Sequence, residues 1–137
     1  MKRAKSGIAA AFMLFMLTAL TGCSDFNRID FQYSADLPLD ILVSYEEIRL
    51  PTGVAVTAVA RPMADGSLMA RDTLVELSSE NPGILGVAFA LPNKLGTGTE
   101  NADWTFVLYA VNAGSTEVTV RVDSEVKGEI PVTILPQ

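Results

Sequence analysis

Histidine is absent from this 137-residue chain, and cysteine occurs only once, at Cys23. Without histidine, the chain lacks the side chain that most often acts as a general base and as a metal ligand. One cysteine cannot form a disulfide within the chain, so the fold must be held together by its hydrophobic core. These absences exclude histidine-based hydrolysis and histidine metal centres.

The remaining residues offer no other catalytic combination. Beyond the first five residues the chain has only two lysines, Lys94 and Lys127, and neither belongs to a serine–lysine pattern. The glycine-rich residues 96–99 lack the lysine of a phosphate-binding loop. Glu46 and Glu47 are adjacent, so on a strand they would face opposite ways and could not act as a catalytic pair. We therefore predict that the protein is not an enzyme and binds no cofactor.

The first 23 residues have the organisation of a secretory signal peptide. A basic start at Lys2, Arg3 and Lys5 precedes an apolar run over residues 8–20 and a short stretch of small residues. A membrane-spanning helix needs about 20 apolar residues, whereas this run supplies 13. The pattern therefore favours a cleaved signal peptide over residues 1–22 rather than an uncleaved anchor.

The end of this segment, Leu20-Thr21-Gly22-Cys23, resembles the signal of bacterial lipoproteins. The resemblance implies cleavage between Gly22 and Cys23, a diacylglycerol on the Cys23 sulfur, and acylation of the new amino terminus, for example by palmitate. Two or three acyl chains would hold the protein durably at a membrane. By the same resemblance, Ser24 is compatible with export to the outer membrane.

Processing makes the chain strongly acidic. Removal of residues 1–22 leaves 115 of the 137 residues, a length suited to one domain. The loss of three basic residues reduces the ten lysines and arginines to seven, against 16 acidic residues, so the side-chain charge becomes −9. Such a surface repels phosphate backbones, and we predict that the protein does not bind nucleic acid.

Residues 23–38 are expected to link the lipidated cysteine to a domain over residues 39–137. The segment mixes aromatic residues with aspartates, so an alternative is that part of it docks on the domain or on a partner. The aspartates do not have the alternate-position spacing of a calcium-binding loop, and no metal site is predicted.

From residue 39 the pattern is all-β, with short apolar stretches separated by turn residues. In Glu117–Val122 the alternation places Val118, Val120 and Val122 on the inner face. Pro62 is expected to end the strand that begins at residue 54, because proline cannot continue a hydrogen-bonded ladder. Two short apolar pieces are expected at residues 41–43 and 48–50, and strands at residues 54–60, 73–77, 84–91, 104–111, 117–122 and 130–134. Seven or so short strands at this spacing indicate a β-sandwich.

Three stretches of the chain combine strands with turn residues. They are residues 48–54, with a glycine turn at Gly53; residues 75–87, with a serine pair and an Asn-Pro turn; and residues 110–120, with a glycine-hinged hairpin at Gly114. In this order they resemble a bacterial immunoglobulin-like domain of group 2. The resemblance implies an immunoglobulin-like β-sandwich. It also implies an association with adhesion and surface-assembly systems, in which such domains serve as spacers and contact modules.

The strand over residues 104–111 is apolar on both faces, whereas a sandwich strand normally buries one. We therefore identify Val107, Tyr109 and Val111 as a candidate docking surface. The alternative is that a long loop or the N-terminal segment covers this face. The loop over residues 92–103, with Lys94, Thr97 and Thr99, is a second candidate for partner recognition. Loops on a sandwich tolerate sequence variation and often carry the residues that bind a ligand or partner.

The sequence thus favours a non-catalytic, lipid-anchored module of the bacterial cell envelope that contacts another envelope or surface protein. Its expected location is the outer membrane, facing the periplasm or the exterior. The alternative is a module that binds a cell-wall or capsular glycan. In that case Trp104, Tyr109 and Tyr45 would be the available stacking rings.

Overall fold

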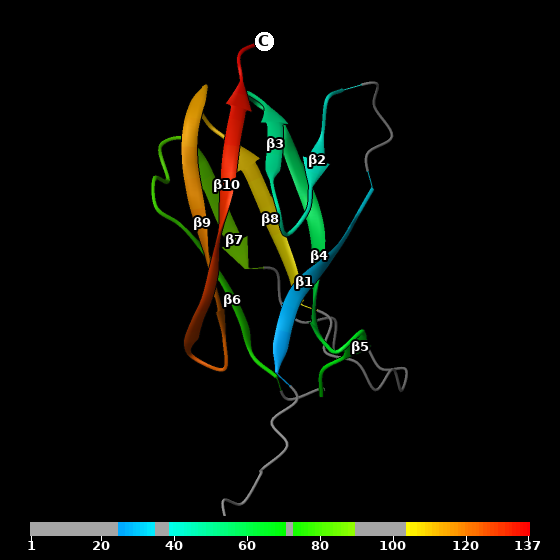
Figure 1. Ribbon diagram of the computed structural model, residues 1–137. Coiled ribbons are helices and arrows are strands. Elements are labelled where there is room, and N and C mark those ends of the chain that lie inside the picture. The colour runs from blue at the N-terminus through cyan, green and yellow to red at the C-terminus, as the bar shows by residue number, and fades with distance from the viewer. Residues whose placement is uncertain (1–24, 35–38, 71–72, 90–103) are drawn as a thin grey trace, which may run out of the picture.

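A computed structural model describes residues 25–34, 39–70, 73–89 and 104–137, which form ten strands in two sheets (Figure 1). In sheet A the strand order is β1-β4-β8-β7, and β5 pairs with β4; in sheet B it is β2-β3-β10-β9-β6. Sheet A consists of β1 (Phe26–Tyr33), β4 (Ala55–Ala64), β5 (Ser67–Leu68), β7 (Leu85–Phe89) and β8 (Trp104–Ala110). Sheet B consists of β2 (Leu42–Val43), β3 (Ile48–Pro51), β6 (Val75–Ser79), β9 (Gly114–Val122) and β10 (Glu125–Leu135).

The two sheets pack face to face around one apolar core, which confirms the predicted all-β, immunoglobulin-like sandwich (Figure 1). Every second residue of the central strands is buried, as the pleat of a half-buried sheet requires. Val118, Val120 and Val122 of β9 are at most 2% exposed, which confirms the predicted inner face. Burying such a side chain contributes about 1.5–3 kcal/mol relative to leaving it exposed. The described residues include no helix long and apolar enough to cross a membrane.

The chain crosses from one sheet to the other several times. The turn at residues 51–54 connects β3 of sheet B with β4 of sheet A and forms hydrogen bonds to both sheets. Gly53 has a φ of 80°, a conformation that favours glycine. Its N–H donates to the Ala110 carbonyl of sheet A at 2.9 Å, while the Thr52 N–H donates to the Leu135 carbonyl of sheet B at 2.8 Å. The turn therefore fixes the position of one sheet relative to the other.

Strand β4 continues through Pro62 to Ala64, so the predicted end at this proline is wrong. The Pro62 carbonyl accepts from the Met69 N–H at 2.9 Å. In an extended strand the nitrogen and oxygen of one residue point to the same side, so the proline nitrogen also faces away from β1. On that side the pairing with β8 has already ended, at Ala60 and Trp104. The missing N–H therefore costs no ladder hydrogen bond, which is the condition for proline in a strand.

The segment expected as a linker, residues 23–38, contains a strand of the sandwich. Strand β1 pairs antiparallel with β4 along its length, and Ile29 is 1% exposed within the core. The aromatic residues that alternate with aspartates in the sequence thus belong to a half-buried strand. This outcome supports the docked alternative for residues 26–33 and extends sheet A by one edge strand.

Strand β1 also closes one side of the sandwich against sheet B. The rings of Phe26 and Tyr45 meet edge to face with centroids 5.9 Å apart. The Tyr33 hydroxyl donates to the Ile41 carbonyl at 3.2 Å. Contacts from β1 to the residues beside β2 therefore close this side of the sandwich.

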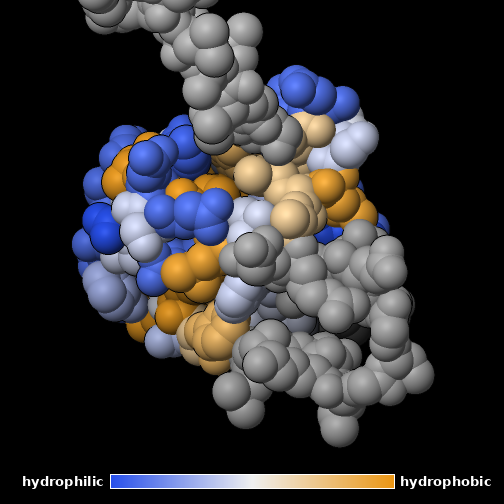
Figure 2. Space-filling view, turned by 90° about the horizontal axis from the view of Figure 1, so that it is seen from below, coloured by the Kyte–Doolittle hydropathy of each residue, from blue (hydrophilic) through white to orange (hydrophobic). Residues whose placement is uncertain are grey.

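The sandwich has two distinct ends. At the β1 end lie the start of β1, the β4–β5 hairpin and the β9–β10 hairpin (bottom of Figure 1), and apolar residues stand among hydrophilic ones on this surface (Figure 2). The β4–β5 hairpin turns at Asp65 and Gly66, both with positive φ, which is typical of a tight Asp-Gly hairpin turn. The C-terminus lies at the opposite end, which we call the far end.

Replacement of Gly114 by valine is expected to destabilise the fold. Gly114 opens β9 with a φ of 149°, and an added Cβ would lie 3.1 Å from Cδ1 of Ile84. Strained backbone of this kind costs about 1–3 kcal/mol. We expect Gly114→Val to lower Tm by several degrees in thermal unfolding followed by circular dichroism.

The neighbouring variant Ala113→Val is the matched control, because Ala113 is exposed and does not require a positive φ. It should melt close to the wild-type temperature. Equal melting of the wild type and Gly114→Val would show that the glycine conformation is not needed.

Candidate interaction surfaces

The outer face of sheet A is uncharged over three neighbouring strands. This patch, which we call the sheet A face, is formed by β7, β8 and the first part of β4. No charged side chain lies on this stretch of the face in the described residues, and the first one along β4 is Arg61. Its members are Ala55, Thr57, Val59, Gly86, Ala88, Thr105, Val107 and Tyr109. A contiguous uncharged face of this kind is typical of a contact surface.

The outer face of sheet B has the opposite character. Its outward positions carry Glu76, Glu80, Glu117, Arg121 and Glu129. Charged side chains on an exposed strand surface favour solvation. The outer face of sheet B is therefore well solvated. Removal of the outer face of sheet A from water, by contrast, would be favourable.

Tyr109 is the most prominent side chain of the sheet A face, and it is held in place by a glycine. The two residues Gly86 and Tyr109 stand opposite each other in the β7–β8 register. A Cβ built on Gly86 would fall 1.8–2.3 Å from atoms of the tyrosine ring, so the ring lies across the glycine. Gly86 is buried by this contact, while Tyr109 remains 43% exposed. One side of the ring is thus packed and part of it faces solvent.

The structure places two of the three predicted docking residues on this face. Val107 and Tyr109 point outward from β8, and Val111 follows the end of the strand with 38% of its surface exposed. The Val111 N–H donates to the Ile84 carbonyl at 2.8 Å, which holds it beside β7. Strand β1 extends sheet A beside β4 and does not lie over β8, so residues 26–33 do not cover the patch. The other predicted residues, Gly22, Cys23, Lys94, Thr97 and Thr99, lie outside the described residues.

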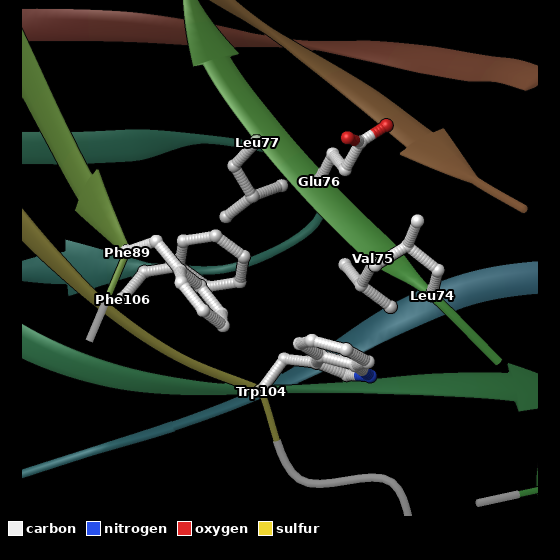
Figure 3. Close-up of a pocket in the computed structure, with 7 residues that line it drawn as sticks. All are labelled: Leu74, Val75, Glu76, Leu77, Phe89, Trp104 and Phe106. Atoms are coloured by element: carbon white, nitrogen blue, oxygen red, sulfur yellow. The ribbon is translucent and has the colours of Figure 1, made fainter. Parts of the chain in front are cut away.

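A groove opens between the two sheets on the side opposite β1 and β2. It has a volume of about 370 Å³ and lies between β6 of sheet B and β7 and β8 of sheet A (Figure 3). Its lining is largely apolar and consists of Leu74, Val75, Glu76, Leu77, Phe89, Trp104 and Phe106. The groove thus brings apolar side chains of both sheets together along this edge.

Three aromatic rings form one wall of this groove (Figure 3). The Phe89 ring lies 5.7 Å from that of Trp104 and 5.6 Å from that of Phe106, measured between centroids. The Trp104 indole N–H donates to the Thr73 carbonyl at 2.8 Å. This hydrogen bond connects β8 of sheet A with the residues just before β6 of sheet B. Phe89 is 49% exposed. The sequence pattern did not identify Phe89, because its exposure depends on where the edges of two sheets separate.

Sequence reasoning also missed a group of three carboxylates on the outer face of sheet B. Oxygens of Glu80, Glu117 and Glu129 lie within 4.8 Å of one another. The charge of Glu129, and then that of Glu80, raises the pKa of Glu117. Carboxylate oxygens are ligands for calcium and magnesium, but exposed acidic groups commonly meet without an ion. The effect that follows directly from this geometry is electrostatic repulsion.

No protein-family model matches this sequence, and no curated protein sequence matches it either. Similar solved structures are domains of the S-layer protein SbsC. The crystal structure of a long fragment of that protein aligns with a TM-score of 0.51 and 14% identity, and the alignment covers 81% of this chain and 13% of the other. The structure of its domains 4–9 gives a TM-score of 0.50 and 14% identity, over 82% of this chain and 15% of the other.

A shorter structure, of SbsC domains 4 and 5, gives a TM-score of 0.49 and 13% identity over 81% of this chain and 54% of the other. The chain thus spans about half of that two-domain structure and a small part of the longer ones. At this level of identity the likeness shows a shared fold. The sandwich is an architecture that also occurs as one domain among several in a surface layer protein.

The contact between Gly86 and Tyr109 is expected to make mutations at the two positions non-additive. Gly86→Ala should destabilise the wild type, because the new methyl group displaces the tyrosine ring. In a Tyr109→Ala background the same change should cost little, because the space is then free. A double-mutant cycle by chemical denaturation should give a coupling of about 0.5–3 kcal/mol, the range for residues in contact.

Ala88→Ser is a suitable control, because Ala88 is an exposed member of the same face and stands opposite Val107. It should show additive behaviour with Tyr109→Ala. Additive effects of Gly86→Ala and Tyr109→Ala would contradict the packed arrangement of the ring.

The carboxylate group predicts a pH-dependent stability with a defined sign. Because the pKa of Glu117 is raised in the folded state, the folded chain binds this proton more readily than the unfolded chain does. Repulsion therefore lowers stability as the pH rises from the ordinary glutamate value of 4.5 through the folded pKa. We expect Glu117→Gln to raise Tm at neutral pH, and the gain to vanish below the ordinary value.

High salt should also reduce the gain, because exposed charges are screened. Glu76→Gln is the matched control on the same outer face, since Glu76 stands opposite Arg121 in the register rather than among carboxylates. This control should leave Tm unchanged or lower it. A Glu117→Gln variant that melts below the wild type at neutral pH would contradict the assignment of repulsion.

Proposed function

We propose that this protein is a non-catalytic, lipid-anchored module of the bacterial cell envelope that contacts another envelope or surface protein through the sheet A face. The observation that carries the proposal is the uncharged outer face of β4, β7 and β8, with Tyr109 43% exposed. The shared fold with domains of a surface layer protein supports a structural role. Because a fold does not fix a function, the surface chemistry is the stronger argument.

The anchor is proposed from the sequence of residues 20–23. A cysteine directly after a basic start, an apolar run and small residues favours lipid attachment at Cys23. Each buried methylene contributes about 0.8 kcal/mol, so two or three acyl chains hold a protein at a membrane durably. With Ser24 next to the cysteine, the proposed location is the outer membrane.

The sheet A face has the chemistry of a protein contact. Tyrosine is enriched at interfaces because it buries a large apolar area and keeps a hydroxyl group for hydrogen bonding. The Tyr109 ring is fixed over Gly86, so little side-chain freedom is lost when a partner covers it. The small side chains around it, such as Ala55 and Ala88, allow a partner to approach closely.

The resemblance to group 2 immunoglobulin-like domains supports a role as a spacer or contact module. The glycine turn at Gly53 and the hairpin at Gly114, two of the features that carry this resemblance, both have positive φ. Membership of that group remains part of the proposal. It would place the protein in adhesion or surface assembly.

The positions of the aromatic rings give less support to the glycan alternative. Trp104 is half-buried in the groove and its indole N–H is bound to the Thr73 carbonyl. Tyr45 packs against Phe26, and burial raises the pKa of its hydroxyl. Of the three rings proposed for stacking, Tyr109 is exposed, whereas Trp104 and Tyr45 are half-buried. A sugar platform normally offers several exposed rings, so the geometry favours a protein partner.

Site-specific photo-crosslinking in intact cells tests the contact. A benzoylphenylalanine at position 109 should give a discrete crosslinked product with one protein. The same probe at position 121, which is exposed on the outer face of sheet B, is the control and should give none. Equal products from both faces, or no product from position 109, would contradict the proposed surface.

Metabolic labelling with an alkyne analogue of palmitate tests the anchor independently. The wild type should be labelled and should float with membrane vesicles, whereas Cys23→Ala should do neither. An unlabelled wild type would refute the anchor and leave the contact surface to be judged on the crosslinking alone.

A further inference from the structure

We propose that the β1 end of the sandwich lies directly against the membrane, with the β4–β5 and β9–β10 hairpins in contact with lipid headgroups. The inference rests on the lipid anchor at Cys23 proposed above, and it adds an orientation and a second contact surface. The occupant of this surface is a zwitterionic phospholipid bilayer whose headgroups carry ammonium groups. The argument depends on the length of the tether, on the position of β1, and on the chemistry of the two hairpins.

The tether between the anchor and the fold is very short. Only Ser24 and Asp25 separate Cys23 from Phe26, the first residue of β1. An extended residue spans at most about 3.3–3.6 Å, so the Cα atom of Phe26 lies no more than about 11 Å from that of Cys23. A chain of this length cannot lift the domain away from the headgroup layer.

The strand that receives the tether is firmly integrated in the fold. Phe26 pairs with Ala64 in the β1–β4 register and its ring packs against Tyr45. The Asn27 side-chain oxygen accepts a hydrogen bond from the Asp65 N–H of the β4–β5 hairpin. Because β1 is fixed at its first residues, the short tether constrains the whole sandwich and not only its first strand.

Two hairpins stand beside this attachment point. The β4–β5 hairpin is joined to β1 through Asn27, and the β9–β10 hairpin lies close enough for the charge of Asp25 to act on Lys127. Both hairpins lie at the same end as the start of β1 (Figure 1). Val126 of the second hairpin is 56% exposed, more than the other large exposed hydrophobic side chains of the described residues. It is thus placed where an apolar side chain can enter the headgroup region.

The charge at this end selects the lipid. The tether, the start of β1 and the two hairpins carry Asp25, Asp65, Asp123 and Glu125 against two bases, Arg28 and Lys127, and Glu125 already binds Lys127 at 2.9 Å. This excess of carboxylates repels anionic headgroups. Ammonium groups of a zwitterionic lipid such as phosphatidylethanolamine can instead pair with the carboxylates. The surface therefore fits a zwitterionic bilayer and disfavours an anionic one.

This orientation places the strands upright on the membrane. The far end, with the C-terminus, then points away from the bilayer, as it lies opposite the β1 end (Figure 1). The sheet A face stands roughly perpendicular to the membrane plane. A partner would therefore reach Tyr109 from the side, at the same membrane surface.

Spin labels on single cysteines test the orientation. Cys23 is the only cysteine of the chain and is occupied by lipid in the anchored protein, so one introduced cysteine can be labelled alone. Ser124→Cys and Ser67→Cys place labels on the two hairpins at the β1 end. Ala113→Cys is the matched control at the β8–β9 turn, and all three positions are exposed.

The full-length lipidated variants are incorporated into vesicles of phosphatidylethanolamine and phosphatidylcholine that contain a small fraction of a nickel-chelating lipid. Headgroup-bound nickel accelerates the relaxation of nearby spin labels. We expect a several-fold larger relaxation enhancement at positions 124 and 67 than at position 113. An equal enhancement at the hairpins and at position 113, or none at the hairpins, would overturn the orientation.

Vesicle flotation of the same samples separates the two proposals. Protein that floats with the vesicles but shows no difference between labels retains the anchor and refutes the orientation. Protein that fails to float refutes both. When part of the zwitterionic lipid is replaced by phosphatidylglycerol at low salt, the enhancement at position 124 should fall, and an unchanged value would refute the role of the carboxylates.

Discussion

The packing of sheet A against sheet B is the interaction on which the rest of this structure depends. The chain has one cysteine and the described residues hold few ion pairs, so the apolar side chains between β4 and β8 on one side and β9 and β10 on the other supply most of the stability. Leu108, Val118 and Ile130 are fully buried in this layer. The turn at Gly53, the closure by β1 and the two outer faces are all positioned by it.

The two outer faces of the sandwich differ in their chemistry. Sheet B carries charged residues on its outer face, and three glutamates around Glu117 repel one another there. Sheet A instead exposes small uncharged residues and Tyr109. In a sandwich that acts as a monomer, both outer faces are normally polar, because both meet water. The unequal faces are therefore the feature that most directly suggests a partner.

Much of the fold could be predicted from local patterns, because a two-residue period and turn residues are local properties. The inner face of β9 and the turn at Gly53 are examples. The features that could not be predicted depend on distant partners. Strand β1 forms because β4 offers a free edge, Pro62 is tolerated because β8 has ended beside it, and the groove at Phe89 exists because two sheet edges separate. Tyr109 could be selected from the sequence because both faces of its strand are apolar, and its role in docking stays a prediction.

The parallel pairing of β3 with β10 has a consequence for the order in which the protein can fold. Strand β10 stands between β3 and β9, so sheet B stays divided until the last residues of the chain are available. Contacts between such distant segments form slowly, because a long loop must close first. During synthesis, which begins at the N-terminus, the chain therefore lacks a complete core until β10 has been made. Such a chain acquires most of its stability late, when β10 joins the two halves of sheet B.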